Sequence, residues 1–172
     1  MMTSENSNKQ INNQRSALGV ITANNVNQLR RLNSVLFPVH YSPQFYKDVI
    51  QAGELAKLCY FNDVCVGAVC CRKDNPERDQ TLEKGQASLY LMTLGVLAPY
   101  RRLGLGSMMI KHVLEQCKAD DSLVKIYLHV QTSNEDALKF YANYGFEQKE
   151  VVPSYYKNIQ PADAILLERK LK

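Results

Sequence analysis

A short loop with two arginines and two glycines is the stretch of this sequence best suited to bind an anion. It runs from Arg101 to Gly106 with the pattern Arg-x-x-Gly-x-Gly, and it separates an apolar strand-like run from a helix expected to begin after Gly106. The first N–H groups of a helix have no partner inside it and lie at the positive end of its dipole. Glycine lets the backbone approach a ligand closely. A pyrophosphate is the natural occupant, although a glycine pair alone can also be an ordinary turn.

Tyr90 and His129 are the side chains best placed to move a proton beside this loop. Alternation along a strand puts Tyr90 on the face shared by Met92, Leu94 and Val96, and His129 on a face shared by Tyr127 and Gln131. An imidazole has an ordinary pKa of about 6.5 and can therefore take a proton near neutral pH. On the residues alone, His129 can equally be a satisfied histidine of the core.

A strand–helix–strand unit is expected to position these residues. Hydrophobic periodicity predicts a strand over 88–97, a helix over 107–119 and a strand over 125–131. The two strands should be parallel and joined by a right-handed crossover. Open sheets bind ligands beyond the carboxyl ends of such strands, which is where the loop and His129 both fall.

The remaining segments complete an α/β pattern in one domain over 17–172, preceded by a polar tail over 1–16 that we expect to be disordered. A helix with the apolar stripe Val26, Leu29, Leu32 and Leu36 is expected to be capped by Thr22 or Asn24 and ended by Pro38. Asn62-Asp63 predicts a hairpin turn, and the charged loop 74–85 is expected only to link strands. The other expected elements are strands over 17–21, 55–61, 64–72, 146–152 and 164–170, and helices over 43–52 and 134–144, the second ending at Gly145.

Composition excludes several classes of protein. The chain has 172 residues, 45% of them hydrophobic, and a net charge of +4, which is too small to indicate nucleic-acid binding by itself. Five cysteines without a Cys-x-x-Cys pair argue against a disulfide framework and against a zinc site, so most should be small buried hydrophobes. No run is long enough to span a membrane, and we expect a cytoplasmic protein without a metal, with the nucleus as a second compartment.

The loop also carries a resemblance to a known family. Arg101–Gly106 matches the Q/R-x-x-G-x-G/A pyrophosphate loop of the GNAT superfamily of acetyl-CoA-dependent N-acetyltransferases. From about Val20 to Leu171 the chain resembles, within that superfamily, the catalytic subunits of NatE type, on the stretches Phe37–Val39, Tyr90–Gly95, Ala98–Arg102, Tyr127–Gln131 and Tyr155–Tyr156. The resemblance implies a GNAT fold, with a mixed central sheet of about seven strands flanked by about four helices. It also implies acetyl-CoA as the acetyl donor and CoA as a product.

The resemblance assigns roles to individual residues. Tyr90 and His129 would deprotonate an α-amine through ordered water. The cofactor would be held by Leu94, Val96, Arg101, Arg102, Leu103, Gly104, Leu105, Gly106, Ser107, Asn134 and Tyr141. Peptide contacts would come from Phe37, Pro38, Val39, Tyr41, Met92, Tyr155, Tyr156 and Ile159. Without the resemblance, the loop over 37–41 can be a helix–helix corner, and the tyrosine pair can be a cover of surface aromatics.

Acetyl transfer to an amine needs a base for the amine, a donor for the developing oxyanion and a proton for the leaving thiolate. A backbone N–H near Leu94–Val96 could donate a hydrogen bond to the oxyanion, and Tyr141 could donate a proton to the thiolate. An α-amine, with a pKa of about 7.7–8.0, is neutral far more often at pH 7 than a lysine at about 10.4. This chemistry therefore suits an N-terminus better than a lysine side chain.

The resemblance further implies N-termini that begin with Met and a hydrophobic residue, on nascent or mature chains, and association with NatA complex subunits at the ribosome. Two alternatives stay open. One is a GNAT enzyme that acts on lysine or on a small amine, and the other is a weakly active acetyl-CoA-binding subunit of the NatA complex.

Overall fold

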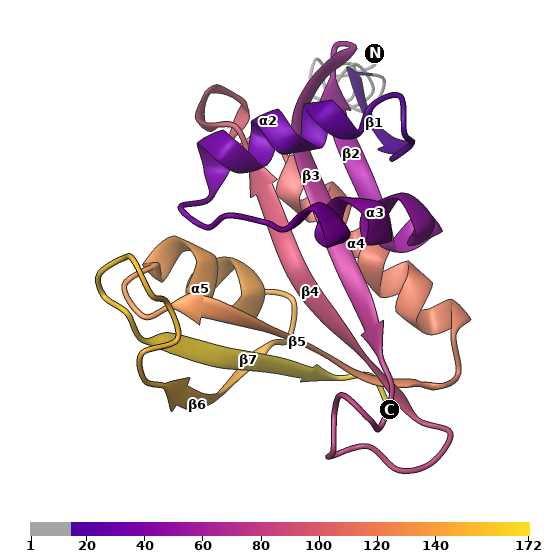
Figure 1. The fold of residues 1–172 in the computed structure, drawn as a ribbon, viewed down its shortest axis with the longest axis vertical. Coiled ribbons are helices and arrows are strands. Elements are labelled where there is room, and N and C mark those ends of the chain that lie inside the picture. The colour runs from indigo at the N-terminus through magenta and orange to yellow at the C-terminus, as the bar shows by residue number, and fades with distance from the viewer. Residues whose placement is uncertain (1–14) are drawn as a thin grey trace, which may run out of the picture. The chain divides into compact units, whose positions relative to one another are not determined.

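The computed structural model describes residues 15–172. The described chain holds seven strands in the sheet order β1-β2-β3-β4-β5-β7-β6, and four α-helices with two short 3-10 helices (Figure 1). Except for Arg15 and Ser16, the predicted tail lies outside the described residues, and Ser16 already belongs to the first strand. The elements are β1 (Ser16–Val20), α2 (Val26–Leu36), α3 (Pro43–Gln51), η1 (Gly53–Leu55), β2 (Ala56–Phe61), β3 (Val64–Asp74), β4 (Ala87–Val96), η2 (Ala98–Tyr100), α4 (Leu105–Ala119), β5 (Leu123–Gln131), α5 (Glu135–Ala142), β6 (Glu147–Val152) and β7 (Ala164–Lys170).

The chain divides into two compact units, each built from two separate stretches. The first comprises the described residues up to Cys71 together with Thr93–Gln116. The second comprises Arg72–Met92 and Cys117–Lys172. β3, β4 and α4 each pass from one unit to the other.

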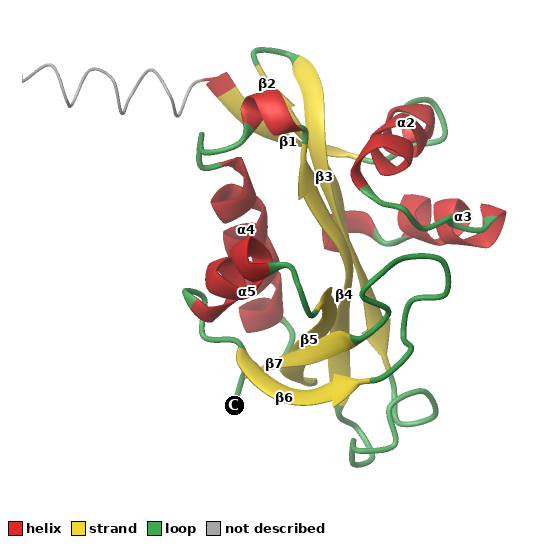
Figure 2. Ribbon diagram, turned by 90° about the vertical axis from the view of Figure 1, so that its left-hand side faces the viewer, coloured by secondary structure: helices red, strands yellow, loops and turns green. Residues whose placement is uncertain are grey.

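The first unit is built on an antiparallel pairing of β1 with β2 and of β2 with β3. Asn62 and Asp63 join β2 to β3 with φ angles of 49° and 64°, which confirms the predicted two-residue hairpin turn. α2 and α3 lie on one face of these strands and α4 lies on the other (Figure 2). α4 buries Leu105, Met109, Ile110, Val113 and Cys117, an apolar stripe at helical spacing.

The start of α2 differs from the prediction, because neither Thr22 nor Asn24 caps it. Asn25 occupies the N-cap position and makes no side-chain cap bond. Its side chain instead accepts a hydrogen bond from Thr22 N–H at 2.7 Å and donates one to the Val20 carbonyl at 2.8 Å. The polar groups of the β1–α2 connection therefore satisfy one another. The other end agrees with the prediction, since Phe37, which precedes Pro38, is extended and ends the helix.

The second unit contains the predicted parallel pair. β4 pairs with β5 in parallel from Ala87↔Leu123 to Tyr90↔Tyr127. β5 pairs with β7, and β7 with β6, in antiparallel fashion, and Figure 1 shows α5 beside β5 and β7. The β4–β5 register ends at Tyr90 and Tyr127, although both strands continue.

Two predicted boundaries move because of specific residues. Gly104, with a φ of +79°, is the last residue before α4, so the helix begins at Leu105 rather than after Gly106. Gly106 thus belongs to the first turn of the helix. β3 extends to Asp74, which was predicted to open a linking loop. Asp74 is 2% exposed, and its carboxylate accepts a hydrogen bond from Tyr127 on β5, so the expectation that this segment only links strands is wrong at Asp74.

The five cysteines are free thiols, and four of them are buried, as predicted for small hydrophobic residues. None of the helices within residues 15–172 is long and apolar enough to cross a membrane.

Candidate active site

Three side chains of the second unit form a short chain of hydrogen bonds. The Tyr90 hydroxyl, on β4, lies 2.9 Å from Nδ1 of His129, on β5. The same hydroxyl lies 2.9 Å from the hydroxyl of Tyr155, in the β6–β7 connection. The Tyr155 ring stacks on the His129 ring at 4.3 Å between centroids, with 17° between their planes. Tyr90 is therefore the centre of a three-residue relay, and the structure brings together both predicted catalytic residues and one predicted peptide contact.

The protonation states of this relay follow from burial. Burial lowers the pKa of His129 below its usual value, against an opposing effect of the Glu150 carboxylate. Burial also raises the pKa of Tyr90, and the bond to Tyr155 raises it further. At neutral pH the imidazole is therefore neutral and Tyr90 keeps its proton. Tyr90 can donate to Nδ1 while accepting from Tyr155, or the bonds can run the other way, so a proton can shift along the chain.

Two further residues of this unit contact the Tyr90 ring, and a third, Asp74, binds both of them. The Tyr127 ring lies 4.7 Å from it between centroids, and the Arg72 guanidinium lies 4.9 Å from its centre. Both side chains bind the buried carboxylate of Asp74. Sequence reasoning assigned none of these three a role. Alternation did place Tyr127 on the face of His129, but nothing in the sequence indicated that Asp74, 53 residues earlier, contacts it.

The other predicted site residues of the second unit lie at several places. Met92 follows Tyr90 on the same face of β4 and is half-buried, as are Tyr156 and Ile159. Asn134 is the N-cap of α5, where its Oδ1 accepts from Ala137 N–H at 3.2 Å. Tyr141 is 6% exposed and packs against Phe140 and Phe146. The cofactor roles of Asn134 and Tyr141, and the proton-donor role of Tyr141, stay predictions.

The predicted anion loop lies in the first unit, directly before the first turn of α4. α4 begins at Leu105, which leaves the N–H groups of Leu105, Gly106 and Ser107 without an acceptor inside the helix, whereas Met108 N–H bonds the Gly104 carbonyl. A Cβ atom on Gly104 would meet nothing within 4 Å, so the backbone there is open to approach. These residues fit the anionic part of acetyl-CoA by their donors and by their open backbone.

The arginines of this loop differ in what they bind. Arg101 donates from Nε to the Val96 carbonyl at 3.1 Å, which ties the loop to the end of β4. Arg102 adopts a φ of +63°, and both arginines are exposed. Leu103 is also exposed, whereas Leu105 is 2% exposed and packs in the core. Two positive charges therefore accompany the free N–H groups.

The predicted peptide-contacting loop over 37–41 also belongs to the first unit. Phe37 lies against β4, since a Cβ atom on Gly95 would meet its Cζ at 3.0 Å. Phe37 and Tyr41 make an edge contact at 6.3 Å, and Tyr41 packs on Phe45 at 4.6 Å. Pro38 and Val39 are exposed. The structure thus places Phe37 beside Gly95, and the peptide-binding role of the loop stays a prediction.

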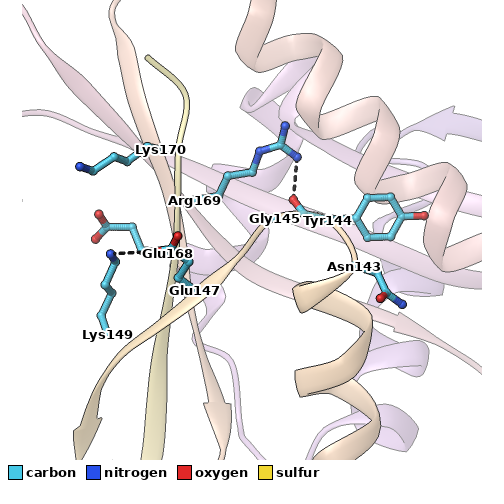
Figure 3. Close-up of a pocket in the computed structure, with 8 residues that line it drawn as sticks. All are labelled: Asn143, Tyr144, Gly145, Glu147, Lys149, Glu168, Arg169 and Lys170. Carbon is cyan, nitrogen blue, oxygen red and sulfur yellow. Dashed lines mark hydrogen bonds and ion pairs between the residues drawn. The ribbon is translucent and has the colours of Figure 1, made fainter.

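A pocket of about 550 Å³ opens elsewhere in the second unit and contains none of the predicted site residues (Figure 3). In it Arg169 Nη1 donates to the Tyr144 carbonyl at 2.7 Å, and Lys149 pairs with Glu147 at 3.0 Å. Its lining is Asn143, Tyr144, Gly145, Glu147, Lys149, Glu168, Arg169 and Lys170. Among residues 15–172, no group of three or more His, Cys, Asp or Glu side chains is arranged to hold a metal ion.

Comparison with known proteins decides the family. The profile of the acetyltransferase (GNAT) family matches residues 25–146. This chain belongs to the GNAT acetyltransferase family. It is 54% identical over 158 residues to N-alpha-acetyltransferase 50 of Danio rerio, covering 92% of this chain and 90% of that protein. It is 50% identical over 155 residues to the probable N-acetyltransferase san of Drosophila melanogaster, covering 90% and 80% respectively.

Solved structures agree with the sequence relatives. Naa50 of Arabidopsis thaliana, in complex with the bisubstrate analogue CoA-Ac-MVNAL, superposes with a TM-score of 0.82 at 46% identity, covering 90% of this chain and 98% of that one. NAA60 of the same plant in complex with acetyl-CoA has a TM-score of 0.81 at 20% identity, which shows the shared fold. The predictions of the GNAT fold, of an acetyltransferase and of acetyl-CoA as its acetyl donor are confirmed.

Proposed function

We propose that this protein transfers an acetyl group from acetyl-CoA to the α-amine of polypeptides that begin with Met followed by a hydrophobic residue, as a NatE-type enzyme. The observation that carries the proposal is the relay of Tyr155, Tyr90 and His129, with 2.9 Å at each hydrogen bond. It offers a neutral base coupled to two hydroxyls, which is what removal of a proton from an ammonium group requires.

The chain's own residues account for the proton chemistry. Acetyl-CoA supplies an activated acetyl thioester when it is bound. His129 is neutral at pH 7, because burial lowers its pKa, and can accept a proton through the Tyr90 hydroxyl or an intervening water. An α-amine with a pKa of about 7.7–8.0 gives up its proton far more readily than a lysine side chain. The relay is therefore matched to an N-terminus.

The preference for Met-hydrophobic termini has two supports. Aromatic and aliphatic residues predominate among the proposed peptide contacts, and a methionine thioether packs well against ring edges. The Arabidopsis Naa50 that resembles this chain at 46% identity was solved with an analogue whose peptide part is MVNAL. That peptide begins with Met and Val, as the proposed preference requires.

We also propose a cytoplasmic location, with the nucleus as a second compartment, and association with NatA complex subunits at the ribosome. The five free thiols are compatible with a reducing compartment. Emerging N-termini are the substrate that such an association would bring to the enzyme. The resemblance of the sequence to NatE-type subunits supports the association itself.

The experiment is a turnover assay of the purified chain with acetyl-CoA and four peptides. A Met-Leu peptide, the same peptide with a blocked α-amine, a Ser-leading peptide and a blocked peptide with an internal lysine are compared by mass spectrometry. The proposal expects acetylation of the free Met-Leu peptide in preference to the other three. Preference for the lysine peptide would instead support a lysine acetyltransferase. Binding of acetyl-CoA without turnover of any peptide would support a weakly active subunit.

A further inference from the structure

The Asp74 carboxylate is a buried charge that the proposed proton relay does not use. Its side chain is 1% exposed. Oδ1 accepts from Arg72 Nε at 2.7 Å, and Oδ2 accepts from Arg72 Nη2 at 3.2 Å. Oδ2 also accepts from the Tyr127 hydroxyl at 2.7 Å. A buried carboxylate is costly unless it is paired and hydrogen-bonded, so this one is fully engaged by two side chains.

Both partners of Asp74 contact the ring of Tyr90. The Arg72 guanidinium lies 4.9 Å from the ring centre, within the range of a cation–π contact. The Tyr127 ring lies 4.7 Å from the Tyr90 ring, with 42° between their planes. A third neighbour, His129, makes an edge contact at 5.7 Å. Asp74 therefore binds two of these three neighbours of the Tyr90 ring, while Tyr155 bonds the Tyr90 hydroxyl.

The strand order explains this arrangement. β4 lies between β3 and β5, and Tyr90 is the register partner of Tyr127 across the parallel ladder. Arg72 and Asp74 come from the end of β3, on one side of Tyr90, and Tyr127 comes from β5 on the other. The Tyr127–Asp74 bond therefore crosses β4, the strand that carries Tyr90, at the point where the β4–β5 register ends.

We propose that Asp74 is a positioning residue for acetyl transfer, which holds Arg72 and Tyr127 against the Tyr90 ring so that the Tyr90 hydroxyl stays within hydrogen-bond distance of His129. This inference rests on the proposed function. Asp74 touches neither His129 nor the Tyr90 hydroxyl, so it acts through its two partners. Displacement of a catalytic group by about 1 Å can cost roughly a hundredfold in rate.

Other charges near the cluster provide controls. Arg78 lies 3.8 Å from Asp74 but is 58% exposed, so it is a peripheral ion pair. Asp120 offers a comparison carboxylate in the same unit, more exposed at 34%, which accepts from Lys73, the neighbour of Arg72, at 2.6 Å and from the Ser122 hydroxyl at 2.7 Å. Asp74→Asn and Asp120→Asn make the same chemical change. In each case the lost carboxylate binds a positively charged side chain of β3 and a hydroxyl group.

The kinetic experiment uses the full chain with acetyl-CoA and a Met-Leu peptide. Asp74→Asn should lower kcat about tenfold or more, because the relay is misplaced, while KM for both substrates changes little. Tyr127→Phe keeps the ring and removes only the hydroxyl, so it should lower kcat by less than Asp74→Asn does. The double variant Asp74→Asn/Tyr127→Phe should have a kcat no lower than that of Asp74→Asn alone. Asp120→Asn and Arg78→Ala should leave kcat unchanged.

A double-mutant cycle of Asp74→Asn with Tyr90→Phe distinguishes a positioning role of Asp74 from a merely structural one. If Asp74 acts through the Tyr90 hydroxyl, Asp74→Asn should cause no further loss of kcat in a Tyr90→Phe background. An equal loss in both backgrounds would overturn the proposal. If Asp74→Asn does not fold, the same cycle is run with Tyr127→Phe, which keeps the packed ring.

A second measurement does not need turnover, and so separates this inference from the proposed function. The chain has three histidines, which makes the His129 ring resonances assignable by NMR. They should shift in Asp74→Asn in the same direction as in Tyr90→Phe, and not in Asp120→Asn. Unchanged His129 resonances in a folded Asp74→Asn protein would overturn the positioning role, whatever peptide the enzyme prefers.

Discussion

The hydroxyl oxygen of Tyr90 lies 2.9 Å from Nδ1 of His129, and the two residues come from neighbouring parallel strands. Tyr90 belongs to the last register pair of that ladder, and His129 lies two residues beyond its partner Tyr127. At neutral pH Tyr90 keeps its proton and the neutral imidazole of His129 can accept one. The proposed acetyl transfer rests on this pair, and several of the expected outcomes below test its role.

Removal of the Tyr90 hydroxyl should disable the relay without unfolding the protein. Tyr90→Phe keeps the ring between Arg72 and Tyr127 but removes the donor to His129. Steady-state kinetics should show a fall in kcat of about 10²–10⁴-fold, with little change in KM. Tyr60→Phe is the control, because it removes a hydroxyl that bonds only the exposed Gln28 side chain at 3.2 Å. An equal loss of activity in both variants would contradict a specific role of Tyr90.

The pH profile of kcat/KM should have two breaks. One belongs to the substrate α-amine, near its pKa of about 8, and the other to His129, below about 6.5 because burial lowers its pKa. The rate should therefore rise most steeply below the His129 break and level off above the amine break. His129→Gln should remove the lower break and leave the upper one. A lower break above 6.5 in the wild type would contradict a buried neutral base.

The lowered pKa of His129 should also make the free energy of unfolding fall as the pH is lowered. The folded-state pKa of His129 is lower than its unfolded value of about 6.5, so the unfolded chain binds more protons below that pH. The contribution of His129 is fully present above about pH 6.5 and is lost as the pH falls through the lowered folded-state pKa. Urea denaturation between pH 5 and 7 should show this loss in the wild type. The same series should show less of it in His129→Gln.

The sequence predicted the elements well where local chemistry decides them. Pro38 ends α2, Asn62-Asp63 forms the hairpin turn, and alternation gives the faces of β4 and β5 correctly, with Leu89, Leu91 and Leu128 buried and Tyr90 and His129 half-buried. The resemblance to the family indicated Tyr90 and His129, which the structure joins by a hydrogen bond, and their catalytic role stays a prediction.

Contacts between residues far apart in the sequence could not be predicted from it. The Asp74–Tyr127 bond joins residues of β3 and β5, and the side-chain bonds of Asn25 displace the expected helix cap. Stacking of Tyr155 on His129 likewise depends on the path of the β6–β7 connection. Each of these depends on tertiary packing, which overrides local preference.

Gly104 should be required for cofactor binding as well as for backbone geometry. Gly104→Ala puts a side chain at φ +79°, which should cost about 1 kcal/mol of the free energy of unfolding and disturb the free N–H groups at the start of α4. KM for acetyl-CoA should rise. Gly85→Ala is the matched control, with φ +84° and open space around its Cβ position, in the connection between β3 and β4. It should lose similar stability without a change in KM, and a rise in KM for both variants would contradict the anion loop.

Gly67 should be required for the close approach of β3 to β4. A Cβ atom there would lie 2.6 Å from the Gly95 carbonyl oxygen, which is backbone and cannot rotate away. Gly67→Ala should therefore lower the free energy of unfolding by about 1–3 kcal/mol, measured by chemical denaturation. Gly19→Ala should cost less, since its Cβ would meet only the edge of the Tyr60 ring at 2.8 Å, and a side chain can move. The reverse order would contradict this account.

The passage of the chain between its two compact units has a practical consequence for protein engineering. The boundaries fall inside β3, β4 and α4, after Cys71, Met92 and Gln116. Neither unit is a contiguous stretch, so no single cut yields a fragment that contains one whole unit and none of the other. Attempts to express either unit alone, or to split the enzyme into complementing halves at one site, should give insoluble fragments. A circular permutant whose new ends lie in the Asn62–Asp63 turn leaves all three crossings intact.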